Sequence, residues 1–129
     1  MNTQKKTHFL LLDRLEQVIK KINFINNEMK SEYINSFLKK LYKLEFKFYS
    51  NYKILLDNYL TKNKYNIKHH EKTNESAFIL LEFAQNGNDE LYLYIADELK
   101  LYYYISSYIH DTTQEKENEK PIPLSFAVF

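Results

Sequence analysis

The amino-acid sequence predicts an all-α fold, a single-domain four-helix bundle with an extended C-terminal tail. Three observations favour this fold. Apolar residues recur at alternating spacings of four and three through much of the chain, which is the period of a helix face. The 129 residues include only one glycine, which is sparse for a sheet protein that needs tight turns. Apolar residues make up 44% of the chain and aromatic residues 16%, enough for one packed core.

Residues 7–60 are expected to form a basic helical hairpin. Its first helix runs from about Thr7 to Asn26, where two asparagines can end it in the left-handed region. Ser31 is expected to cap the second helix, which runs to about Leu60. The apolar faces of the two helices are formed by Leu11, Leu15, Val18, Ile22 and Ile25, and by Ile34, Leu38, Leu41, Phe48, Tyr52, Leu55 and Tyr59.

The acidic, aromatic-rich half at residues 75–110 allows two interpretations. Residues 61–74 lose the helical period and predict a loop before it. In the favoured interpretation two more helices follow, with a helix end at Asn86-Gly87. In the alternative, an α+β fold, the N-terminal helical hairpin packs on a small antiparallel sheet, which the Tyr and Ile content supports. We prefer helices because the second strand connection, at Asp97-Glu98, has no Gly or Asn.

Residues 111–129 are expected to form a mobile linker and an apolar tail. The linker, 111–120, is polar and dense in charge. The tail reads Pro121-Ile-Pro-Leu-Ser-Phe-Ala-Val-Phe129, and its two prolines favour an extended backbone. This composition is typical of a short strand or a docking peptide. We expect the tail to pack on its own domain.

The charges are divided between the two halves of the chain. Residues 1–72 carry fourteen Lys and one Arg against seven carboxylates, a formal +8, whereas residues 73–129 carry three Lys against ten carboxylates, a formal −7. These opposite charges favour packing of one half against the other, although each exposed ion pair contributes only ~0–1 kcal/mol. The chain has no cysteine, which is compatible with a cytoplasmic location. The apolar run from Phe9 to Leu12 is too short to span a membrane.

Residue patterns for catalysis are missing. There is no cysteine nucleophile, no Gly-x-Ser-x-Gly turn and no glycine-rich phosphate loop, so the sequence predicts neither an enzyme nor a bound cofactor. No two of the four histidines have the helical spacing of metal ligands, and no metal is predicted. Glu45 and Glu98 do fall on the spacing of apolar faces. They would pair with Tyr or Lys, or else belong to a carboxylate-bridged metal-binding helical bundle, the less favoured alternative.

Two surfaces are candidates for binding. Lys40, Lys43 and Lys47 lie opposite an apolar face, and such a stripe could bind a nucleic-acid backbone without sequence preference. The more specific pattern lies on the fourth predicted helix, where carboxylates and tyrosines share one side. Carboxylates steer a basic protein and tyrosines supply contact area. This side is formed by Glu90, Asp97, Leu101, Tyr104 and Tyr108.

Together these features predict a small cytoplasmic protein that binds another protein and catalyses nothing. Its expected class is an inhibitor of the immunity or antitoxin type, which occludes a basic partner such as a nuclease toxin. A nucleic-acid-associated accessory protein that uses the Lys stripe is the first alternative.

Overall fold

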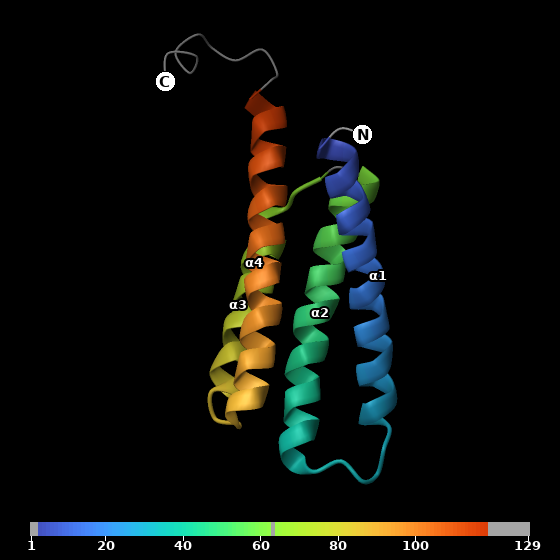
Figure 1. The fold of residues 1–129 in the computed structure, drawn as a ribbon, viewed down its shortest axis with the longest axis vertical. Coiled ribbons are helices and arrows are strands. Elements are labelled where there is room, and N and C mark those ends of the chain that lie inside the picture. The colour runs from blue at the N-terminus through green and yellow to red at the C-terminus, as the bar shows by residue number, and fades with distance from the viewer. Residues whose placement is uncertain (1–2, 63, 119–129) are drawn as a thin grey trace.

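The computed structural model describes residues 3–62 and 64–118, and its regular elements are helices throughout. Helices α1 (Thr3–Met29), α2 (Ser36–Lys62), α3 (Ile67–Ala84) and α4 (Asp89–Asn118) run alternately up and down the bundle (Figure 1). The predicted all-α four-helix bundle is therefore confirmed. The α+β alternative is wrong, because residues 77–84 and 89–109 are helical. The predicted C-terminal tail lies outside the described residues.

Asparagine side chains cap the starts of three helices. The Oδ1 atoms of Asn35, Asn66 and Asn88 accept hydrogen bonds of 2.8, 3.0 and 2.7 Å from the backbone N–H groups three residues later, those of Leu38, His69 and Leu91. Each bond satisfies a donor that has no partner within the helix. The cap predicted at Ser31 is wrong, since α2 begins only at Ser36.

Three predicted boundaries also need correction. The loop predicted over residues 61–74 is too long, because the Asn66 cap lets α3 begin at Ile67. The first helix continues past the two asparagines to Met29, which packs against the core. The linker predicted from residue 111 starts too early, because α4 continues to Asn118. In that last stretch Thr113 is buried and its hydroxyl donates to the Ile109 carbonyl at 2.7 Å.

The turn between α3 and α4 lies where Asn86-Gly87 predicted a helix end. A Cβ atom on Gly87 would lie 2.8 Å from Cδ2 of Leu91 and 3.2 Å from Cζ of Phe37. The turn therefore packs tightly against the start of α4 and the first turn of α2, which explains a glycine at this position.

The core contains aliphatic residues from all four helices around a cluster of three rings. Phe48 and Tyr52 of α2 meet Tyr102 of α4 edge to face, with ring centroids 5.1 and 5.0 Å from that of Tyr102. All three are fully buried, and Tyr102 donates a hydrogen bond of 2.6 Å to Oδ1 of Asn74 on α3. Edge-to-face rings add to the stabilisation from buried area, by about 0.5–1.5 kcal/mol a pair. The aliphatic part of the core includes Leu11, Val18, Ile25, Leu55, Leu80, Ile95, Leu99 and Ile109.

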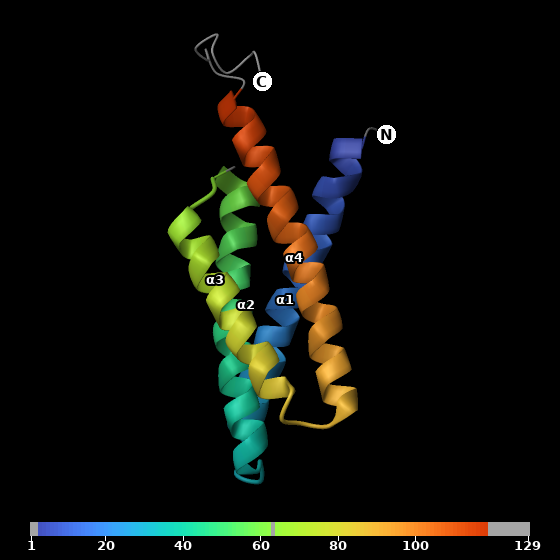
Figure 2. The ribbon, with the colours of Figure 1, turned by 90° about the vertical axis from the view of Figure 1, so that its left-hand side faces the viewer.

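Helices α1 and α4, the first and the last, cross each other rather than running side by side. In both ribbon views the N-terminal end of α1 and the C-terminal end of α4 lie apart at the same end of the bundle (Figures 1 and 2). The basic hairpin α1–α2 thus packs against the acidic pair α3–α4. The interface between these two pairs, called the seam below, includes the crossing of α1 and α4. Among the described residues, no helix combines the length and apolar character needed to cross a membrane.

Candidate functional site: the groove between α1 and α4

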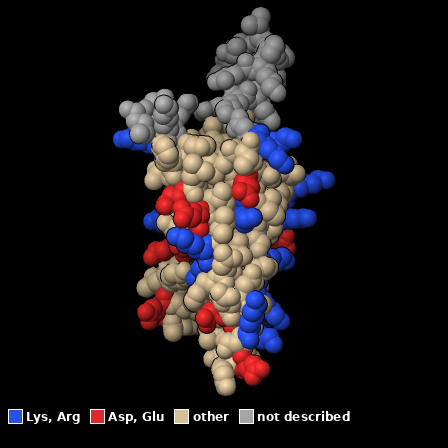
Figure 3. Space-filling view, turned by 90° about the vertical axis from the view of Figure 1, so that its right-hand side faces the viewer, with Lys and Arg blue, Asp and Glu red and all other residues tan. Residues whose placement is uncertain are grey.

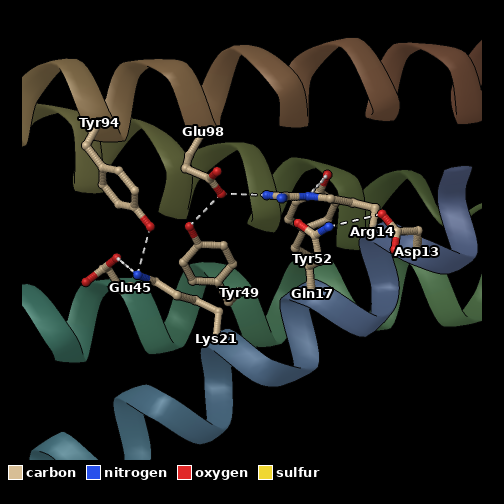
Figure 4. Close-up of polar contacts among 9 residues, drawn as sticks. All are labelled: Asp13, Arg14, Gln17, Lys21, Glu45, Tyr49, Tyr52, Tyr94 and Glu98. Atoms are coloured by element: carbon tan, nitrogen blue, oxygen red, sulfur yellow. Dashed lines mark hydrogen bonds and ion pairs between the residues drawn. The ribbon is translucent and has the colours of Figure 1, made fainter.

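A buried ion pair joins α1 to α4 where the two helices cross. Nη2 of Arg14 donates to Oε2 of Glu98 at 2.6 Å, and Oη of Tyr49 donates to the same oxygen at 3.0 Å (Figure 4). Nε of Arg14 donates to Oη of Tyr52 at 3.4 Å, and the guanidinium lies over the Tyr52 ring. Arg14 is only 8% exposed. The positive charge of the guanidinium is thus neutralised by Glu98 inside the fold.

A second polar cluster lies two turns along α1. Nζ of Lys21 lies 3.7 Å from Oε2 of Glu45 on α2 and donates to Oη of Tyr94 on α4 at 2.8 Å (Figure 4). Its charge also lies 4.9 Å from the centre of the Tyr94 ring. The two clusters place charged groups from α1, α2 and α4 in the seam, each with a partner.

The two clusters shift the pKa values of their members in ways that follow from burial. Burial raises the pKa of Glu45, and the nearby charge of Lys21 offsets only part of this effect. Burial lowers the pKa of Lys21, but the bond to Tyr94 and the charge of Glu45 outweigh it, so the net pKa is raised. Burial raises the pKa of Tyr52 to about 12, although the Arg14 charge opposes it. At neutral pH Tyr52 therefore keeps its proton, and its hydroxyl oxygen accepts the hydrogen bond from Nε of Arg14.

Both carboxylates that the sequence placed on apolar faces have cationic partners. Glu45 lies beside Lys21, and Glu98 lies beside Arg14 and a tyrosine. Of the two arrangements considered from the sequence, pairing with neighbouring side chains and metal bridging, the structure contains the pairing. Within the described part of the chain, no three His, Asp or Glu side chains come close enough together to hold a metal ion.

Beyond the Arg14 pair, α1 and α4 leave a cavity of about 440 Å³ that opens to the surface. Its walls are mainly apolar and aromatic. Polar groups line the side toward α1, where Asp13 accepts a hydrogen bond of 3.0 Å from Gln17. The cavity, called the α1–α4 groove below, is lined by Thr7, Leu10, Leu11, Asp13, Arg14, Gln17, Leu101, Tyr104, Ile105 and Tyr108.

The structure brings three of the five predicted partner-binding residues together in this groove. Leu101 is 41% exposed and Tyr104 is 77% exposed, while Tyr108 is half-buried with its ring edge to face against Tyr59 at 6.3 Å. Asp97 is exposed on α4, one turn before Leu101, and does not line the cavity.

Glu90 lies farthest from the groove. It is exposed in the first turn of α4, where a carboxylate also stabilises the helix dipole. The five predicted residues therefore do not form one continuous patch. Three of them form an apolar wall of the groove, and the two carboxylates form an acidic surface nearer the start of α4, called the acidic approach below.

The α1 side of the groove was missed from the sequence. The sequence pattern did not identify Leu10, Asp13 or Arg14 as candidates. A signal for Arg14 was present, because it lies three residues after Leu11 and four before Val18, on the apolar face of α1. A charged residue on such a face needs a partner of opposite charge.

The lysines of the alternative surface lie elsewhere, on α2. Lys40, Lys43 and Lys47 are all exposed, and Nζ of Lys40 lies 5.5 Å from the centre of the Phe83 ring. Figure 3 shows the side of the bundle that α1 and α2 present, with Lys and Arg side chains frequent along one edge and acidic side chains among them. Lys47 borders a second cavity, between α2 and α3, that also includes Glu75.

Two histidines predicted to lie in a loop belong to α3 instead. Nε2 of His69 lies 2.8 Å from the Asn51 carbonyl, and Nδ1 of His70 lies 2.5 Å from Oη of Tyr65. The His70 ring also lies edge to face with that of His110, at 6.3 Å. Burial lowers the pKa of His70, and the nearby His110 adds to this effect. The meeting of His70 with α4 could not be predicted from spacing, because the two rings are far apart in sequence.

Comparison of the chain with known protein families, with curated proteins and with solved structures finds no match.

Proposed function

We propose that this protein binds another protein through the α1–α4 groove and has no catalytic role. The observation that carries the proposal is the groove itself, an open cavity of about 440 Å³ whose α4 wall exposes Leu101 and Tyr104. Large apolar and tyrosine side chains that line a concave surface are the usual anchors of protein recognition. Tyrosine suits such a wall because it contributes area and a hydrogen-bonding hydroxyl with little loss of side-chain entropy.

The charges around the groove favour a basic partner. Asp13 and Asp97 are exposed on its two sides, and Glu90 lies farther along α4. The one arginine that lines the groove is neutralised by Glu98. A partner surface with Lys or Arg around an apolar side chain would match both the walls and the rim. Carboxylates at such a rim increase the association rate more than the final affinity.

The specific form proposed is an inhibitor of the immunity or antitoxin type, acting on a nuclease-like toxin. A nuclease binds the phosphate backbone through a basic cleft, and the carboxylates of α4 would occupy that cleft in place of phosphate. The partner would then be blocked because its substrate site is covered, with no chemistry required of the inhibitor. Support for this form comes from the small size of the chain and from its acidic, tyrosine-bearing helix.

The test is an affinity capture from cells that carry the gene, with three versions of the protein as bait. Wild-type protein should retain a basic partner. The variant Leu101→Lys/Tyr104→Lys should lose it, because two charged side chains replace the apolar wall. A matched control, Lys43→Glu/Lys47→Glu, changes two exposed residues on α2 and should retain the same partner.

Kinetics with the purified partner then test the steering role of the rim. Asp97→Lys should lower the association rate constant about tenfold at low salt and have less effect at high salt. Retention of the same partner by the groove variant would disprove the proposed surface. Loss of binding only in the α2 variant, together with loss of RNA or DNA binding, would instead support the nucleic-acid alternative.

A further inference from the structure

The apolar wall of the groove is uncovered over a length that suits an extended peptide. Leu10 of α1 is 68% exposed and faces the same cavity as Leu101 and Tyr104 of α4. From Leu101 to Tyr108 the α4 wall covers eight residues, a length of ~10 Å along the helix. An uncovered concave surface of this kind gains free energy when an apolar segment fills it.

The chain itself contains a segment with the matching chemistry, residues 121–129. These nine residues carry no charged side chain, and prolines at positions 121 and 123 disfavour a helix. In an extended backbone alternate side chains share one side. The side formed by even-numbered positions is then entirely apolar and consists of Ile122, Leu124, Phe126 and Val128.

The segment is long enough to reach the groove from the end of α4. Asn118 ends α4, and Tyr104 lies fourteen residues earlier, which corresponds to ~21 Å along the helix. An extended chain advances ~3.3 Å per residue, so about six to seven residues after a reversal at 119 and 120 suffice to return to the level of Tyr104. Phe126 would then lie at about the level of Tyr104, and Leu124 at about the level of Tyr108, which also lines the groove.

We propose that residues 121–129 bind in the α1–α4 groove of their own chain, antiparallel to α4, with Leu124 and Phe126 as the anchors. The tether keeps the effective concentration of the segment high, so that even modest contact area keeps it bound. The bound segment covers the apolar wall and leaves Asp97 and Glu90, nearer the start of α4, open to solvent.

Docking of the segment has a regulatory consequence, which rests on the proposed function. A partner would meet the acidic approach first and would then have to displace the tail from the apolar wall. The apparent affinity for the partner is lowered by the fraction of molecules whose groove is occupied. Removal of the tail anchors should therefore strengthen partner binding, whereas damage to the groove should abolish it.

A tryptophan reporter tests the docking directly, because the chain has no Trp of its own. In the full-length variant Phe126→Trp, docking should shift the emission maximum to shorter wavelength and reduce acrylamide quenching several-fold relative to a free peptide of residues 119–129 with the same substitution. Adding Tyr104→Lys to this variant should restore the emission and quenching of the free peptide. The matched control Ser125→Trp places the reporter on the opposite side of the extended segment and should stay accessible to acrylamide.

Each other outcome overturns the proposal. Emission like that of the free peptide means that the tail does not dock, and protection that survives both Tyr104→Lys and Leu101→Lys means that it docks elsewhere. Protection that disappears on dilution means that the tail binds a second copy of the chain. Circular dichroism of each groove variant checks that the bundle is intact. Because the reporter needs no partner, a failure of docking is distinct from a failure of the partner capture described above.

Discussion

Replacement of Arg14 by methionine should test whether the buried pair with Glu98 holds α1 against α4. Methionine keeps most of the length and apolar contact of the arginine stem but removes its charge and donors. Glu98 would then keep one hydrogen bond, from Tyr49, and would face the seam without a cation. Such a change is far more damaging than loss of a pair at the surface, because an unpaired carboxylate remains behind.

The expected cost can be assembled from the geometry. The bond of 2.6 Å between Arg14 and Glu98 is charge-assisted, and loss of such a bond costs about 1.5–3 kcal/mol. The contact of the guanidinium with the Tyr52 ring, at 5.5 Å, contributes about 0.5–1 kcal/mol more. The Glu98 side chain is 25% exposed, so water reduces the penalty below that of a fully buried charge. We expect a total of about 3 kcal/mol.

Urea denaturation followed by circular dichroism measures this cost. With a slope of about 2 kcal/mol/M, Arg14→Met should lower the unfolding midpoint by about 1.5 M. The double variant Arg14→Met/Glu98→Leu should recover much of the loss, because it removes both charges. The control Lys20→Met disrupts the exposed Lys20–Glu16 pair of 3.4 Å and should change stability by less than about 0.5 kcal/mol. If Arg14→Met behaves like that control, the assigned role of the pair is refuted.

Three further predictions concern other polar groups. The raised pKa of Glu45 means that the folded state holds this proton more tightly than the unfolded state does. Wild type should therefore gain stability relative to Glu45→Gln as the pH falls from about 7 to 4.5. A constant difference between the urea midpoints of the two proteins would contradict this. The pKa of His70 is lowered, so its contribution to stability is present above pH 6.5 and is lost as the pH falls through that value. His70→Gln should flatten the decrease in melting temperature between about pH 7.5 and 5.5, and an unchanged pH profile would exclude the assignment. Asn88→Ala should cost about 1 kcal/mol by removing the α4 cap, whereas the neighbouring Asn86→Ala should cost less than half as much in the same urea assay.

The fold could be predicted from sequence because apolar residues recur every three or four positions along its helices, whereas the strands of a sheet would show alternation. Leu11, Val18 and Ile25 are spaced seven residues apart, and all three are buried on α1. The helix ends were less predictable, since they depend on which of many asparagines acts as a cap. Asn66 was interpreted as part of a polar loop, yet it begins α3. Thirteen asparagines in 129 residues make each individual cap hard to distinguish.

The groove was only half predictable, for a physical reason. Spacing along one helix identifies the residues that share its face, and this placed Leu101, Tyr104 and Tyr108 on one wall. Spacing says nothing of which other helix faces that wall. The contribution of Leu10 and Asp13 depends on the crossing of α1 over α4, which is set by the packing of whole helices. The acidic and apolar parts of the predicted surface separated for the same reason.

The contact between Arg14 and Glu98 also joins residues 84 positions apart in the chain. Helices α1 and α4 share fewer close contacts than the pairs of helices that follow one another in the chain, so their crossing is a candidate for local opening. Amide hydrogen exchange should therefore be faster along the α1–α4 seam than around the ring cluster in the core. A ligand bound in the groove contacts both helices at this crossing and would therefore also slow its local opening.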